Sequence, residues 1–215
     1  MSGTQRLITE PTRRRLTERQ ADTVRRLTDA AVEEVRGTGY DGLTVRNVAR
    51  RAGVAPATAY TYFASKNHLI TEVFWRRLSA LPPVGAGGAL RDRIVAVLRE
   101  TVLLVSDEPE LAAACTTAML GTDPDVRELR ERIGLAIRER LQTAIGDGPS
   151  EGEGSSEGEG EGGGIGDPAA RSRMVHALEM AYTGALVHAG MGYLSYARVA
   201  DRLAETVELI LPDPQ

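Results

Sequence analysis

The chain has 215 residues, of which 42% are hydrophobic but only 4% aromatic, so aliphatic side chains must fill its core, which favours packed helices over a β-sandwich. Its apolar runs are too short to span a membrane, and its single cysteine, Cys115, permits neither an internal disulfide nor a cysteine-based zinc site.

Residues 1–80 contain 14 Lys and Arg against 8 Asp and Glu, whereas residues 81–215 contain 12 against 22. This basic N-terminal third indicates a polyanionic partner, although a solvated arginine-rich surface would give the same balance. The polar N-terminus and the single cysteine lead us to expect a cytoplasmic protein.

The first part of the chain divides into an arm and a small helical domain. Residues 1–17 lack helical periodicity and contain three consecutive arginines, so we expect a flexible basic arm. Residues 18–80 form the first domain, which opens with a helix expected to end at the glycines that begin at Gly37. Two short helices joined by a tight turn follow, and a longer helix is expected from Ser65 to about Ala80.

The second part, residues 89–215, is predicted to be a larger helical domain. Asp123 followed by Pro124 is a strong helix start, with an N-cap residue and then proline at the first helical position. The Gly- and Glu-rich segment 146–167 disfavours helix and is expected to be a disordered linker, and it lacks the fixed geometry that cation binding by its glutamates would need. Periodicity predicts helices at about residues 90–105, 110–120, 124–141, 168–193 and 196–211.

The segment 43–63 has the pattern of a helix-turn-helix. Thr44 can cap the first short helix with its side-chain oxygen. Gly53 lies where the chain reverses, a position that commonly requires positive φ. Pro56 is tolerated in the first turn of the second helix, because its missing N–H would have no partner there. Tyr60 is expected to pack partly into the small core. The overall prediction is an all-α protein with an N-terminal three-helix DNA-binding domain.

A longer string of residues makes this pattern more specific. It contains, in order, Leu43-Thr44-Val45-Arg46, Val48-Ala49, Ala52-Gly53-Val54, Thr58-x-Tyr60-x-Tyr62-Phe63 and Ser65-Lys66-x-x-Leu69. This string resembles the DNA-binding domain of the TetR family of bacterial transcriptional regulators over about residues 20–75, without gaps. The alternative is a helical hairpin with a purely structural role.

The resemblance implies a set of residues that contact double-stranded operator DNA: Thr44, Arg46, Pro56, Ala57, Thr58, Tyr60, Thr61, Tyr62 and Lys66. Among them, Thr44 matches a position that approaches a phosphate at a helix N-terminus. Arg46 matches a position that can grip a guanine edge, but a phosphate contact without sequence information is an equal alternative. Lys66, the only lysine of the chain, matches a phosphate contact.

The last two expected helices carry stripes that suit a homodimer interface. A small-residue stripe permits close helix approach, and an apolar stripe lies on the final helix. The residues predicted at this interface are Ala181, Gly184, Ala185, His188, Leu203, Val207 and Ile210. A monomer that buries both stripes internally is the alternative.

The resemblance also implies a cavity for a small-molecule effector in the second domain, where apolar side chains favour a hydrophobic ligand. The candidates for its lining are Leu98, Val102, Cys115, Thr116, Met119, Met180 and Tyr182, although plain core packing would explain most of them.

No motif of a catalytic site, a metal site or a cofactor-binding loop is present in the sequence. We therefore expect neither an enzyme nor a cofactor or metal, and interpret the chain as a repressor that an effector releases from its operator. An architectural protein that binds DNA without sequence preference is a second interpretation, and a helical enzyme or small-molecule binder is a third.

Overall fold

The computed structural model describes residues 18–146 and 167–211, and within these ranges every regular element is an α-helix. The expected basic arm lies outside the described residues, as does the expected linker apart from its two end residues. The helices are α1 (Glu18–Gly42), α2 (Val45–Arg51), α3 (Pro56–Tyr62), α4 (Lys66–Ser79), α5 (Leu90–Leu103), α6 (Pro109–Met119), α7 (Pro124–Ile145), α8 (Pro168–Gly190) and α9 (Tyr196–Ile210).

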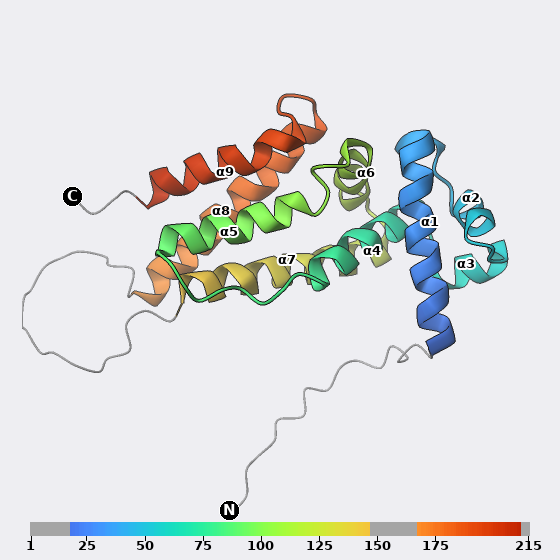
Figure 1. The fold of residues 1–215 in the computed structure, drawn as a ribbon, viewed down its shortest axis with the longest axis horizontal. Helices are drawn as coiled ribbons and strands as arrows, with labels where there is room; N and C mark the ends of the chain where they lie inside the picture. Colours follow the sequence, from blue (N-terminus) through green and yellow to red (C-terminus); the bar gives the residue numbers. More distant parts are fainter. Residues whose placement is uncertain (1–17, 147–166, 212–215) are drawn as a thin grey trace, which may run out of the picture.

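The helices form a small group at one end of the molecule and a longer bundle beside it (Figure 1). The small group consists of α1, α2 and α3, and the bundle contains α5, α7, α8 and α9. Helices α4 and α6 lie between them: α6 packs against both α1 and α4, while α4 also packs against α7. A displacement of α6 would therefore change its contacts with α1 of the small group. None of the described helices combines the length and apolarity needed to cross a membrane.

Helix α1 breaks at the last residue of the predicted stop, Gly37-Thr38-Gly39, and a short helical stretch follows the break. The helix continues through Thr38, whose hydroxyl donates to the Glu34 carbonyl at 2.9 Å. The break comes at Gly39, which has φ 65° and ψ −179°, and one further helical stretch reaches Gly42. Glycine adopts this left-handed φ without the steric cost that a Cβ would impose.

The starts of α2 and α4 have side-chain caps. Thr44 caps α2 by accepting from the Asn47 backbone N–H at 3.1 Å, and Ser65 caps α4 by accepting from the His68 N–H at 3.1 Å. Pro124 occupies the first turn of α7, as predicted. These local signals set the boundaries of the helices that carry the candidate site.

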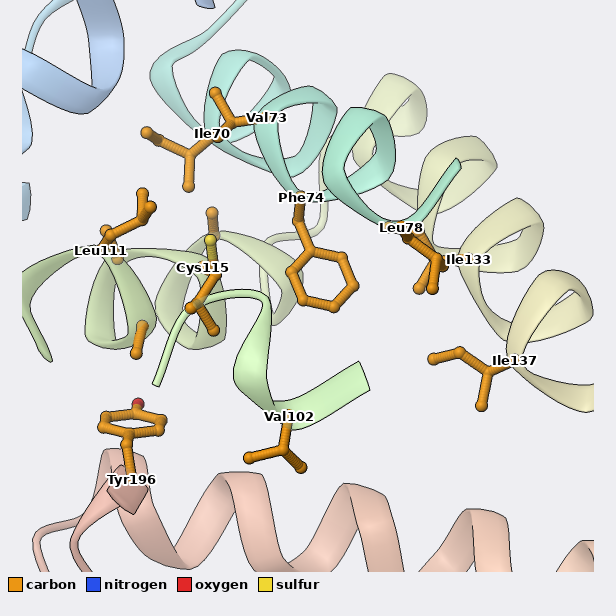
Figure 2. Close-up of a cluster of buried hydrophobic side chains, with 14 of the residues drawn as sticks. Ile70, Val73, Phe74, Leu78, Val102, Leu111, Cys115, Ile133, Ile137 and Tyr196 are labelled. Atoms are coloured by element: carbon orange, nitrogen blue, oxygen red, sulfur yellow. The ribbon is translucent and has the colours of Figure 1, made fainter. Parts of the chain in front are cut away.

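The bundle core is built mainly from aliphatic side chains, as the composition predicted. Figure 2 shows Phe74 and Leu78 of α4 facing Ile133 and Ile137 of α7, with Cys115 of α6 close to the Phe74 ring. All five side chains are buried. This cluster joins α4, which leads out of the small group, to the walls of the bundle.

Candidate nucleic-acid interface and internal cavity

The connection between α2 and α3 has the geometry that the motif predicted. Gly53 has φ 64°, and the chain reverses there before Pro56 starts α3. Arg26 of α1 donates hydrogen bonds to the carbonyls of Ala52 and Gly53, which fixes this turn against the first helix. The turn therefore sets the angle at which α3 leaves α2, and α1 supports it.

Helix α3 buries one residue and exposes most of the others. Ala59 is fully buried, whereas the predicted DNA contacts Pro56, Ala57, Thr58 and Thr61 are exposed. Tyr60 is 52% exposed, so the expectation that it packs into the small core was wrong. The small Ala59 fills that position, and it leaves the Tyr60 ring free to meet an external partner.

Thr44 and Arg46, at the start of α2, are both exposed. The Thr44 hydroxyl accepts from the Asn47 N–H, and its own O–H remains a donor for an external acceptor. Arg46 is exposed and forms no hydrogen bond or ion pair with another residue of the described ranges. Its guanidinium can therefore turn toward an anion without losing an internal contact.

Lys66, in contrast, is tied to α1. Its ammonium donates to the Tyr40 carbonyl at 2.9 Å and lies 4.1 Å from the centre of the Tyr40 ring. An ammonium has three N–H donors, so two remain for a phosphate. Tyr62 is half-buried, like Lys66. His68, near the start of α4, packs edge-on against Phe63 with ring centres 5.4 Å apart.

A cavity of about 330 Å³ lies within the bundle. Its size falls within the range of ~300–1,000 Å³ that is usual for small-molecule sites. Five of the residues predicted for such a cavity come together in its lining: Val102, Cys115, Thr116, Met119 and Tyr182. Leu98 is buried in the core without lining the cavity, and Met180 is 73% exposed on α8.

The rest of the lining was missed in the sequence. It includes Phe74, Thr101, Arg130, Ile133, Gly134, Ile137, Arg138, Glu179, Thr183, Leu186 and Val187. The α7 members follow a helical spacing, and this was the only signal that could have indicated them.

The buried thiol and phenol that line the cavity stay protonated at neutral pH. Burial raises the pKa of the Cys115 thiol to about 12, so the reactive thiolate is scarce at neutral pH. Burial also raises the pKa of the Tyr182 phenol, which therefore stays protonated. Thr116 and Tyr196 are hydrogen-bonded to each other through their hydroxyls at 2.9 Å. The inner wall suits binding of an apolar molecule rather than covalent chemistry.

The predicted dimer face needs one correction. Leu203 and Val207 of α9 are buried within their own chain, where α9 packs against α5 and α8, so they cannot meet a second copy. Gly184 and His188 are exposed, while Ala181, Ala185 and Ile210 are partly buried. The residues predicted for the interface did not include three large apolar side chains that are exposed near these positions: Met180, Met191 and Leu209.

A tight turn before a solvent-facing helix, carried on a helical bundle, defines the class of helix-turn-helix DNA-binding proteins. The family profile described as "Bacterial regulatory proteins, tetR family" matches residues 27–73. An HTH-type transcriptional regulator of Mycobacterium tuberculosis is 46% identical over 196 residues, which cover 90% of this chain and 82% of that protein. The chain belongs to the TetR family of bacterial transcriptional regulators.

More distant proteins are also similar to this chain, in sequence or in fold. The HTH-type transcriptional repressor KstR of Rhodococcus jostii is 27% identical over 198 residues, covering 90% of this chain and 85% of that protein. A TetR transcriptional regulator from Rhodococcus sp. RHA1 superposes with a TM-score of 0.65 at 22% identity, over 87% of this chain and 97% of that one. FadR from Bacillus subtilis, crystallised in complex with stearoyl-CoA, superposes with a TM-score of 0.59 at 19% identity, over 85% of this chain and 96% of that one.

Proposed function

We propose that this regulator is a homodimeric repressor that binds a specific operator through α2 and α3, and that a small apolar effector in the bundle cavity releases it. In this proposal residues 18–80 bind DNA, and residues 89–215 form the dimer and, together with Phe74 of α4, the effector site. The protein acts in the cytoplasm, where the DNA lies. The observation that carries the proposal is the exposure of Pro56, Ala57, Thr58 and Thr61 on one helix behind a supported turn.

Helix α3 enters the major groove in this proposal. It carries no charged side chain, so its contacts with bases are hydroxyl hydrogen bonds and apolar contacts with thymine methyl groups. Charged contacts come from its surroundings, where Arg46 reaches a base edge or a phosphate and Lys66 reaches a phosphate. The hydroxyls of Thr44, Tyr60 and Tyr62 add backbone contacts.

The exposed face of α8, with the end of α9, forms the dimer interface in this proposal. Met180 and Leu209 are largely exposed in the single chain, and Gly184 and His188 lie on the same helix as Met180. A second copy would remove these side chains from water. Two-fold symmetry then places the two α3 helices in successive major grooves about 34 Å apart.

Repression is supported by the relative from Rhodococcus jostii, which is named as a repressor. The cavity supplies a place for the effector, and α6 supplies its connection to the DNA-binding helices. α6 lines the cavity with Ala112, Cys115 and Thr116 while its other contacts reach α1 and α4. A ligand that displaces α6 would change the spacing of the two α3 helices.

A reporter fused to the DNA upstream of the chain's own coding sequence tests this function. We expect the intact protein to lower reporter expression, and expect Thr58→Glu, which places a carboxylate on the DNA face of α3, to restore it. Arg127→Gln, at an exposed position of α7, is the matched control and should repress like the parent. Unchanged expression with the intact protein, or increased expression, would contradict repression.

A further inference from the structure

Three residues of α7 form a polar edge of the cavity. Arg130, Gly134 and Arg138 all line it, and they are spaced four residues apart along the helix. Residues at this spacing lie on one face, roughly 6 Å apart along the axis at ~1.5 Å per residue. Two guanidinium groups therefore flank a glycine at the cavity edge.

Gly134 leaves this edge open. It is exposed, its φ is not positive, and a Cβ built on it would meet nothing within 4 Å. Neither backbone geometry nor crowding therefore requires glycine here, although glycine weakens a helix interior. Its missing side chain leaves open space at the cavity edge between Arg130 and Arg138.

The charges at this edge do not cancel. Arg138 donates two hydrogen bonds to the Glu179 carboxylate, at 2.8 and 2.9 Å, and the pair is neutral. Arg130 donates instead to the carbonyls of Met119 and Gly121, at 2.6 and 3.2 Å. No carboxylate within the described ranges pairs with Arg130, so this edge carries one positive charge beyond its internal pairing.

Behind this edge the lining is apolar, with Phe74 of α4, Val102 of α5, and Ile133 and Ile137 of α7. The Thr101 hydroxyl is already bonded to the Val97 carbonyl at 2.8 Å, and that of Thr116 bonds within the wall. The interior thus offers an apolar chain dispersion contacts and few polar partners.

From this arrangement we propose that the effector is an aliphatic carboxylate, with its chain in the cavity and its carboxylate between Arg130 and Arg138. Guanidinium groups bind carboxylates through charge-assisted hydrogen bonds. A neutral alcohol would lose this contact, and an amine would meet the excess positive charge. This inference rests on the proposed effector site, but the test below uses no DNA, so the two can fail separately.

The test measures binding of three probes with the same chain to the full-length protein by isothermal titration calorimetry at neutral pH: decanoate, decanol and decylamine. We expect decanoate to bind at least roughly tenfold more tightly than the other two. Equal or tighter binding of decanol or decylamine would overturn the proposal, and so would failure of all three probes to bind.

Variants separate the carboxylate site from general apolar binding. Arg130→Gln should weaken decanoate binding roughly tenfold and leave decanol unchanged, whereas Arg127→Gln, outside the cavity lining, should change neither. Glu179→Gln removes the internal competitor for Arg138 and should strengthen decanoate binding several-fold. Gly134→Leu should obstruct all three probes, with circular dichroism confirming that the fold is kept. An affinity for decanoate that is unchanged in both Arg130→Gln and Glu179→Gln would overturn the assignment.

Discussion

Arg77 on α4 donates a 2.8 Å hydrogen bond to the carboxylate of Glu108, the residue directly before α6. The other oxygen of Glu108 accepts from Nε of Arg36, on α1, also at 2.8 Å. One carboxylate therefore joins α1 and α4 to the start of the helix that carries Cys115 and Thr116 into the cavity wall. This connection lies between the cavity wall and α1, the helix that supports the turn before α3.

Glu108→Gln should lower the free energy of unfolding by about 1–2 kcal/mol at neutral pH, because it removes two charge-assisted hydrogen bonds at a mostly buried position. Glu33→Gln is the matched control. Glu33 also pairs with Arg36, but it is exposed, so its loss should cost less than about 0.5 kcal/mol. Urea unfolding of both variants checks this, and equal effects would contradict it.

The Glu108 contribution should depend on pH. Burial alone raises the pKa of this carboxyl, but the hydrogen bonds and charges of Arg77 and Arg36 outweigh burial and leave the pKa below the ordinary value of 4.5. The stabilisation is therefore fully present above pH 4.5 and is lost as pH falls through the lower folded-state pKa. The stability difference between the parent and Glu108→Gln should shrink over that acid range, and a difference that grows there would contradict the assignment.

Gly53 and Gly37 should respond oppositely to alanine. Gly53 has φ 64°, so Gly53→Ala should destabilise the protein by about 1 kcal/mol. Gly37 lies within α1 and a Cβ there meets nothing within 4 Å, so Gly37→Ala should stabilise it by about 0.5–1 kcal/mol. Thermal unfolding measures both shifts, and destabilisation by Gly37→Ala would show that the α1 backbone differs from this description.

The proposed dimer face can be tested where the single chain has free space. A Cβ at Gly184 meets nothing within 4 Å, so Gly184→Glu should fold normally but place a charge inside the interface. Sedimentation velocity should then show a monomer. Leu135→Glu, at an exposed position of α7, is the control and should remain dimeric. Retention of the dimer by Gly184→Glu would place the interface elsewhere.

Arg46→Ala should weaken binding to the upstream DNA roughly tenfold or more, because Arg46 is exposed and has no internal partner within the described ranges. Fluorescence anisotropy with upstream and scrambled duplexes shows the kind of contact. Loss of affinity for the upstream duplex alone indicates a base contact, and equal loss for both indicates a phosphate contact. An unchanged affinity for both duplexes would show that Arg46 does not contact the DNA.

The helix-turn-helix could be predicted from sequence because its determinants are local. The Thr44 cap, the turn at Gly53 and Pro56 at the start of α3 each act within a few residues. Tyr60 was misplaced because Ala59 and Tyr60 are both compatible with an apolar position, and only the packed structure shows which one faces inward.

The bundle was less predictable because its sites form between distant helices. The α9 stripe with Leu203 and Val207 is apolar whether it faces its own chain or a second copy, and the fold assigns it to its own chain. Arg130 and Arg138 have the pattern of solvent-facing residues on α7. Only the packing of α6 and α8 beside them turns that face into the edge of a cavity.

Sequence-specific DNA binding is the central claim, and the ratio of two dissociation constants tests it most directly. The constants are those for the chain's own upstream duplex and for a scrambled duplex of equal composition, measured by fluorescence anisotropy across a series of salt concentrations. The account predicts that the upstream duplex binds more tightly by ~10³ or more at physiological salt. A ratio near one at every salt concentration would contradict it.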